Sequence, residues 1–278
     1  MGSRVLGELQ LELANVSDPG KKRPHNEDSA ITDSALGLAL VADGMGGYKA
    51  GEVASAIAAK VIFDGVKAGQ AQPKPNRASQ DPSPEAVLIR ASIEDANRRI
   101  FHTAHEVPQC QGMGTTVVAA LFSENRVTIA HVGDSRIYLH RDGVLKQVTN
   151  DHSLVQELID RGFFTPEEAL ANTPKNLVTR ALGIDEHVEV DVQELPVQPG
   201  DIYLLCSDGL NDMVNDEEIR LTLSKYSANL AQAADELVQL ANAGGGKDNI
   251  SVVLARPSKP RANKLGLKML SGLRSWGS

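Results

Sequence analysis

The feature that most constrains the fold is an uninterrupted apolar run that ends in Asp-Gly, and it occurs twice. Residues 38–44 (LALVADG) and residues 202–209 (IYLLCSDG) share this design. A short continuous apolar run bounded by turn residues indicates a buried strand. The glycine after each aspartate lets the backbone approach a ligand closely. We therefore expect two interior strands that deliver their aspartates to one shared site.

The other predicted elements occur in groups of strands and pairs of helices. Strands are predicted at 8–17, 29–33, 35–42, 115–122, 127–132, 136–140, 144–148, 188–192, 202–207 and 250–255, and helices at 50–65, 84–100, 216–224 and 229–242. This grouping favours antiparallel sheets flanked by helices over a parallel, doubly wound sheet. The sequence therefore predicts an α+β fold.

Three segments interrupt the pattern. Residues 68–83 are rich in proline and polar residues, which predicts a mobile loop. Residues 151–183 form a polar insert with helical signals between strands, and we interpret it as a movable flap. Residues 257–278 are basic and contain no acidic residue. They are expected to be flexible, with docking to a membrane surface or a protein partner as the alternative.

Charge and cysteine content exclude several classes of protein. The net charge of −8 argues against a nucleic-acid-binding surface as the main function. Two cysteines, Cys110 and Cys206, are too few for a disulfide framework and are expected to be buried free thiols in a reducing cytosol. Neither a signal peptide nor an apolar run of spanning length is visible, so a soluble, cytoplasmic protein is expected. A monomer is a separate expectation.

Aspartates at strand ends and turns are the candidate functional residues. They are Asp28, Asp43, Asp134, Asp208 and Asp248. A single aspartate beside a glycine is usually a turn former. If all five converge, however, their mutual repulsion opposes folding unless cations neutralise it, and the neighbouring sequence contains no basic cluster. Divalent metal ions are the simplest solution.

The ligand types select the metal and the chemistry. Carboxylates, a backbone carbonyl at Gly44 and water are all oxygen donors, which suit Mg²⁺ or Mn²⁺ rather than Zn²⁺. A site with two such ions can activate a bridging water and bind a phosphoryl group. Arg23 is the candidate for gripping the phosphate oxygens. His131, His140 and His152 are interpreted as structural histidines with hydrogen-bond partners.

Eight motifs in order then identify a family resemblance. They are residues 23–28 (RPHNED), 41–47 (VADGMGG), 112–116 (GMGTT), 132–136 (VGDSR), 151–153 (DHS), 179–183 (TRALG), 206–210 (CSDGL) and 247–250 (KDNI). With these residues the chain resembles the bacterial form of the metal-dependent protein phosphatase 2C (PP2C, PPM) family of serine/threonine phosphatases. The resemblance spans about residues 8–256. It implies a catalytic domain over residues 1–256, built as a four-layer αββα sandwich with the metal site at one end.

The resemblance also implies roles for the acidic residues. Asp43 is expected to bridge two metal ions, and the Gly44 carbonyl to bind one of them. Asp208 and Asp248 are expected to complete one coordination sphere. The other sphere is implied to be held by Glu27 and Asp28.

Two further positions match family features. Asp134 resembles the ligand of a third, weaker metal, and Arg23 resembles the arginine that binds phosphate. Asp43, Asp208 and Arg23 are therefore the expected catalytic residues. Met45 stands where animal relatives carry a histidine proposed to protonate the leaving group. We hypothesise that water on the third ion, near Asp134, replaces it.

The resemblance implies hydrolysis of phosphoserine and phosphothreonine in proteins by a water that bridges two Mg²⁺ or Mn²⁺ ions. It further implies phosphoprotein substrates and a bacterial Ser/Thr kinase whose action the enzyme opposes. Two alternatives remain open at this point. One is a phosphatase for small phosphoesters that uses the same site, and the other is an inactive docking scaffold.

Overall fold

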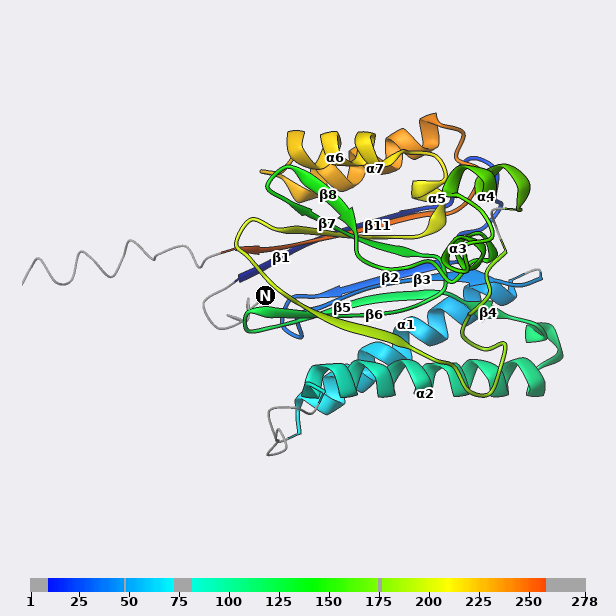
Figure 1. Ribbon diagram of the computed structural model, residues 1–278. Coiled ribbons are helices and arrows are strands. Elements are labelled where there is room, and N and C mark those ends of the chain that lie inside the picture. The colour runs from blue at the N-terminus through cyan, green and yellow to red at the C-terminus, as the bar shows by residue number, and fades with distance from the viewer. Residues whose placement is uncertain (1–9, 48, 73–81, 175–176, 259–278) are drawn as a thin grey trace, which may run out of the picture.

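Two antiparallel sheets face each other, and helices cover the outer side of each sheet (Figure 1). The computed structural model describes residues 10–47, 49–72, 82–174 and 177–258. Within these ranges, no helix has the combination of length and apolar character that a bilayer span requires.

The first sheet has the strand order β1-β11-β10-β7-β8. Its strands are β1 (Gln10–Asp18), β7 (Arg136–Arg141), β8 (Val144–Gln147), β10 (Ile202–Cys206) and β11 (Ile250–Ser258). The second sheet has the order β2-β3-β5-β6-β9, and the short β4 pairs with β3. These strands are β2 (Asp28–Asp33), β3 (Leu38–Met45), β4 (Gly114–Thr115), β5 (Val117–Ser123), β6 (Arg126–Val132) and β9 (Asp191–Pro196).

Long amphipathic helices form the outer layers. The pair α1 (Ala50–Gln70) and α2 (Pro84–Glu106) covers the second sheet, and the pair α6 (Asp216–Lys225) and α7 (Leu230–Ala243) covers the first. Shorter helices are η1 (Pro108–Cys110), α3 (Leu154–Asp160), α4 (Pro166–Asn172) and α5 (Asp208–Asn211). Two helix starts illustrate ordinary capping rules: Ser83 caps α2, with proline as its first residue, and Thr165 caps α4 in a capping box with Glu168.

The core explains why the interior strands read as continuous apolar runs. In β3, Leu38 and Leu40 pack against the α1/α2 layer, whereas Ala39 and Val41 pack between the sheets. In β11, residues likewise alternate between the α6/α7 layer and the space between the sheets. A strand covered on both faces has no solvent side on which polar residues could alternate. The four-layer sandwich expected from the sequence is confirmed.

Several predicted boundaries differ from the structure. The strand predicted at 188–192 is β9, which begins only at Asp191 and ends at Pro196. Val188 and Val190 pack against the helical layer without ladder partners, so their alternation reflects burial rather than sheet pairing. Helices α1 and α2 extend beyond the predicted ends at residues 65 and 100. Their apolar stripes end earlier, because the last turns of both helices are more polar. Most of the predicted loop, at 73–81, and nearly all of the basic tail, at 259–278, lie outside the described residues.

Candidate metal and phosphate site

Two of the predicted aspartates face each other on neighbouring strands. Asp28 is the first residue of β2, Asp43 lies near the end of β3, and the two are direct cross-strand partners. Like charges in this arrangement destabilise a sheet. The pair therefore costs stability unless a proton or a cation lies between the two carboxylates.

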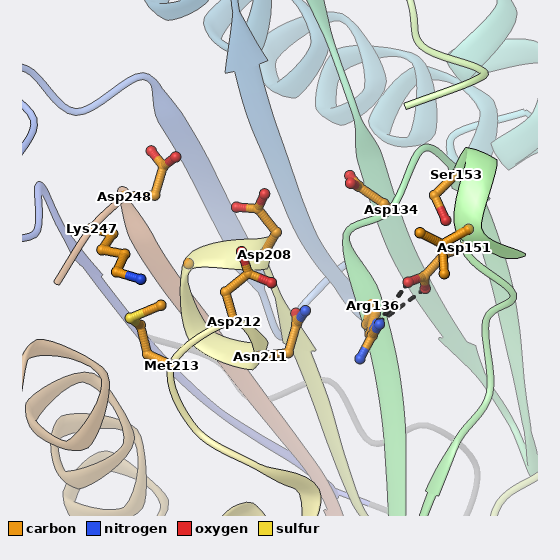
Figure 2. A pocket seen from close by; sticks show the side chains of 12 residues that line it. Asp134, Arg136, Asp151, Ser153, Asp208, Asn211, Asp212, Met213, Lys247 and Asp248 are labelled. Atoms are coloured by element: carbon orange, nitrogen blue, oxygen red, sulfur yellow. Dashed lines mark hydrogen bonds and ion pairs between the residues drawn. The ribbon is translucent and has the colours of Figure 1, made fainter. Parts of the chain in front are cut away.

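The other sheet brings two more carboxylates to the same end of the sandwich. Asp208 follows β10 as the first residue of α5, and Asp248 stands two residues before β11. Together with Asp134, which lies between β6 and β7, they border a cavity of about 500 Å³. Figure 2 shows the three carboxylates along this cavity, with Asp212 next to Asp208.

The pKa values show how closely these groups converge. Burial raises the pKa of Asp43 well above its usual range, and the charges of Asp28, Asp208, Asp134 and Asp248 raise it further, in that order. Burial also raises the pKa of Asp208 to about 8, with Asp134, Asp212, Asp248 and Asp28 contributing in the same direction. A cluster with such raised pKa values is poised to exchange protons for metal ions.

The hydrogen bonding of the two carboxylate oxygens of Asp28 indicates that the site fits a cation. Its Oδ2 accepts a hydrogen bond of 2.7 Å from the Ser207 hydroxyl. Its Oδ1 is buried and has no hydrogen-bond partner among the described residues. Burial raises the pKa of Asp28 to about 6, although hydrogen bonds from serines work in the opposite direction. A buried carboxylate oxygen without a donor, among other carboxylates, fits a hard divalent cation with oxygen ligands.

Gly44 lies where no side chain fits. A Cβ atom at this position would be 2.1 Å from the carbonyl oxygen of Gly51 and 2.6 Å from that of Glu27. The Gly44 N–H donates to the same Glu27 carbonyl at 3.1 Å. The start of α1, the end of β3 and the segment before β2 therefore pack backbone against backbone, which brings Glu27 beside the aspartate cluster.

Arg23 lies at the rim of the site, where its side chain is half exposed. Its Nη2 donates to Oδ2 of Asp248 at 2.6 Å, and this bond is the main reason that its pKa is raised. Glu27 lies nearby: burial raises the pKa of its carboxyl, whereas Arg23 lowers it. Arg23, which the sequence predicts to bind phosphate, is thus bound to Asp248, which the sequence predicts to bind metal.

A group of histidines connects the flap to the Asp134 loop. The N–H of Gly133 donates to Nδ1 of His152 at 3.1 Å, and the N–H of His152 donates back to the Gly133 carbonyl at 2.9 Å. Burial, with His131 and Arg180 nearby, lowers the pKa of His152, so its Nδ1 is free to accept. The rings of His131 and His152 are stacked with centroids 4.6 Å apart. The prediction of hydrogen-bonded histidines is confirmed for both, and His140 bonds to Ser224.

His131, His152 and Asp191 also bring their donor atoms within 4.8 Å of one another, a spacing that could hold a metal ion. Arg180 already supplies the positive charge there: its Nη1 lies 3.1 Å from Nε2 of His152 and 2.8 Å from Oδ1 of Asp191. Metal at Nε2 would also require a proton on Nδ1, which faces the Gly133 N–H. We therefore interpret this group as the anchor of the flap and not as a metal centre.

His152 and Arg180 lie within the sequence motifs, but the motifs did not predict the contacts that these two residues make. A second example is Arg136, which lines the cavity and holds Asp151 through both Nε and Nη2, at 3.0 Å and 2.7 Å from Oδ2 (Figure 2). An arginine and an aspartate separated by 15 residues carry no local signal of pairing.

Comparison with known proteins places this geometry in a family. The family described as protein phosphatase 2C matches residues 22–247. The serine/threonine phosphatase Stp of Listeria monocytogenes is 40% identical over 241 residues, which cover 86% of this chain and 92% of that protein. The crystal structure of the serine/threonine phosphatase PstP of Mycobacterium tuberculosis superimposes with a TM-score of 0.78 at 40% identity, covering 88% of this chain and 98% of that one.

A further crystal structure contains the catalytic domain of PstP in complex with two manganese ions. It matches with a TM-score of 0.76 at 39% identity and covers 90% of this chain and 100% of that one. A family match over most of the chain, relatives of this identity and the carboxylates shared between two sheets agree. The chain belongs to the protein phosphatase 2C family of serine/threonine protein phosphatases.

Proposed function

We propose that this protein removes phosphate from phosphoserine and phosphothreonine in proteins, with Mn²⁺ or Mg²⁺ held between its two sheets. One observation carries the proposal: aspartates from both sheets meet at one end of the sandwich, where a buried oxygen of Asp28 has no hydrogen-bond partner in the described part of the chain. Such a cluster has no structural benefit by itself, because its repulsion opposes folding. It becomes useful when cations bind.

The ligand assignment follows from position. We assign Asp43 to both ions, because four other carboxylates act on it. Asp208 and Asp248, from the first sheet, hold one ion together, and the Gly44 carbonyl is assigned beside Asp43.

The second ion is assigned to Asp28 and Glu27. A third is assigned to Asp134, whose charge acts on Asp208 and whose own pKa is raised to about 6, chiefly by burial.

The protein's side chains prepare the site for phosphoryl transfer. Bound divalent ions supply an activated water and neutralise charge on the phosphoryl group. Arg23, half exposed at the rim, is placed to bind two phosphate oxygens. Ser207 fixes one oxygen of Asp28 and so orients the other. Met45 has no proton to donate, so we assign protonation of the leaving hydroxyl to solvent at the Asp134 end of the cavity.

The biological setting is a proposal of the same kind. We propose phosphoprotein substrates, a bacterial Ser/Thr kinase as the opposing enzyme, and a cytoplasmic monomer. Free, buried Cys110 and Cys206 support a reducing compartment. We assign residues 1–256 to one catalytic domain, with the flap at 151–183, and keep 257–278 as a separate basic tail.

The test is Mn²⁺-dependent release of phosphate from a phosphothreonine peptide and from p-nitrophenyl phosphate, with EDTA as the control. We expect turnover of both substrates and its loss in EDTA. Activity on the small ester alone would favour a small-phosphoester phosphatase. Inactivity on both, in a folded protein, would favour a docking scaffold.

A further inference from the structure

Asn249 connects parts of the chain that are far apart in sequence. Its Oδ1 accepts from the N–H of Glu27 at 2.8 Å, and its Nδ2 donates to the carbonyls of Pro19 and His25 at 3.0 Å and 2.8 Å. The side chain is buried, at 4% exposure. One acceptor and both donors of the amide are therefore bound to the backbone of a single segment, residues 19–27.

That segment crosses from one sheet to the other. It leaves β1 at Asp18 and enters β2 at Asp28, and it contains both Arg23 and Glu27. Its start is also tied to the turn before β11, since the N–H groups of Lys21 and Lys22 donate to the Gly246 carbonyl at 2.7 Å and 3.1 Å. Nearer the site, Asn249 binds both sides of the stretch that carries Arg23.

Asn249 also adjoins the ligands of the first sheet. Its own N–H donates to Oδ1 of Asp248 at 2.9 Å. Its carbonyl lies 3.4 Å from the Ser207 hydroxyl, whose proton is donated to Asp28 at 2.7 Å. A Cβ atom at Gly209 would lie 2.0 Å from that carbonyl, so the turn after Asp208 packs directly on Asn249.

We infer that Asn249 is a positioning residue that holds the phosphate-binding and metal-binding parts of the site in register. It acts through Glu27, Arg23 and Asp248, and this inference rests on the proposed function. Partners that orient metal ligands typically change metal affinity or activity by about 10- to 100-fold when they are lost. Asn249 differs from an ordinary structural asparagine in that the segment it holds carries Arg23 and Glu27, and its own N–H donates to Asp248.

Two variants test this role: Asn249→Asp, which is isosteric but places a further carboxyl beside Asp248, and Asn249→Ala, which adds no charge. Asn249→Asp keeps the acceptor for the Glu27 N–H but replaces the two donors with an oxygen that faces the carbonyls of Pro19 and His25. Segment 19–27 is expected to move away from Asp248, with little change in volume. Asn249→Ala removes all three bonds.

Asn97 provides a matched control. Its Nδ2 donates to the carbonyls of Asp185 and Glu186 at 3.0 Å and 2.9 Å, and its Oδ1 accepts from the Gly183 N–H at 2.8 Å. It is equally buried, at 1% exposure, but it lies on α2 and orients none of the proposed ligands. Asn97→Asp therefore imposes a comparable loss of hydrogen bonds away from the site.

The test compares Asn249→Asp with Asn97→Asp by calorimetric titration with Mn²⁺, by thermal unfolding and by steady-state kinetics. We expect both variants to lose stability. Only Asn249→Asp should weaken Mn²⁺ binding by about tenfold or more and raise KM for a phosphothreonine peptide. Equal Mn²⁺ affinity and KM in the two variants would overturn the inference.

Two further measurements separate the possible failures. If the wild-type protein neither binds Mn²⁺ nor releases phosphate, the proposed function fails, whatever the variants do. If the variants do not fold, amide exchange in the metal-free wild type decides: strong protection of the Glu27 N–H supports its bond to Asn249, and rapid exchange refutes it.

Discussion

Replacing Asp208 with asparagine should stabilise the metal-free protein and at the same time abolish its response to metal. The pKa of Asp208 is raised to about 8 from an ordinary value of 3.8. Its carboxyl must therefore take up a proton on folding at any pH between these values. The resulting contribution to stability is fully present below about pH 4 and is lost as the pH rises toward 8, at about 1.4 kcal/mol per pH unit. Asparagine mimics the protonated form and has no such dependence.

The size of the effect follows from the same shift. A pH of 7 lies 3.2 pH units above the ordinary pKa of 3.8. Asp208→Asn should therefore raise the free energy of unfolding at pH 7 by at most about 4 kcal/mol. Between pH 5 and pH 7 the advantage of the variant should grow by about 2 to 3 kcal/mol. With Mn²⁺ at about 100 times its dissociation constant, the free energy of unfolding of the wild type should rise by about 2.7 kcal/mol. That of the variant should rise much less.

The assay is urea denaturation in EDTA and in Mn²⁺, at pH 5 and pH 7. The control is Asp64→Asn, which removes one negative charge from an exposed position where Lys60 lowers the pKa of the carboxyl. Asp64→Asn should show no gain at pH 7. The reasoning is refuted if Asp208→Asn is no more stable than the wild type in EDTA at pH 7, or if Mn²⁺ stabilises both equally.

Three other predictions concern single groups. Arg23→Ala should raise KM for a phosphothreonine peptide by about 10- to 100-fold, the loss expected for hydrogen bonds to a charged group, and an unchanged KM would rule out phosphate binding there. Affinity for Mn²⁺ should fall as the pH drops from 8 to 6, because Asp28 and Asp134, with pKa values of about 6, regain protons. Calorimetry in buffers of different ionisation enthalpy should detect proton release on binding, and a pH-independent affinity would contradict this. Cys206→Ser should retain turnover, since burial raises the pKa of its thiol to about 12, and inactivation by this change would indicate a thiol mechanism.

Much of the fold follows from local patterns. The apolar runs at β3 and β10 predicted buried strands because a strand covered on both faces needs no polar alternation. The hairpin of β2 and β3 then brings Asp28 opposite Asp43 with few alternatives in register. The misplaced start of β9 shows the limit of such patterns, since Val190 is buried and Val188 partly buried without either being paired.

The assembly of the site depends on contacts that no local pattern encodes. Arg23 meets Asp248 across 225 residues, and Asn249 binds the Glu27 amide across 222. These contacts exist because β1 pairs with β11 and one sheet stacks on the other. Strand ends and turns in the sequence already indicated the five aspartates, Gly44 and Arg23, and the family resemblance added Glu27 and the individual roles. The sequence could not supply the hydrogen bonds that orient these residues.

Strand β11 runs from the cavity to the far end of the first sheet. It begins two residues after Asp248, at the cavity, and its last residue, Ser258, pairs with Gln10 at the other end of the sheet (Figure 1). Nine extended residues span about 30 Å. A fluorophore, affinity handle or surface linker joined after Ser258 is thus attached about 30 Å from the carboxylates. Immobilising the enzyme through that end should leave the mouth of the cavity open to a large phosphoprotein.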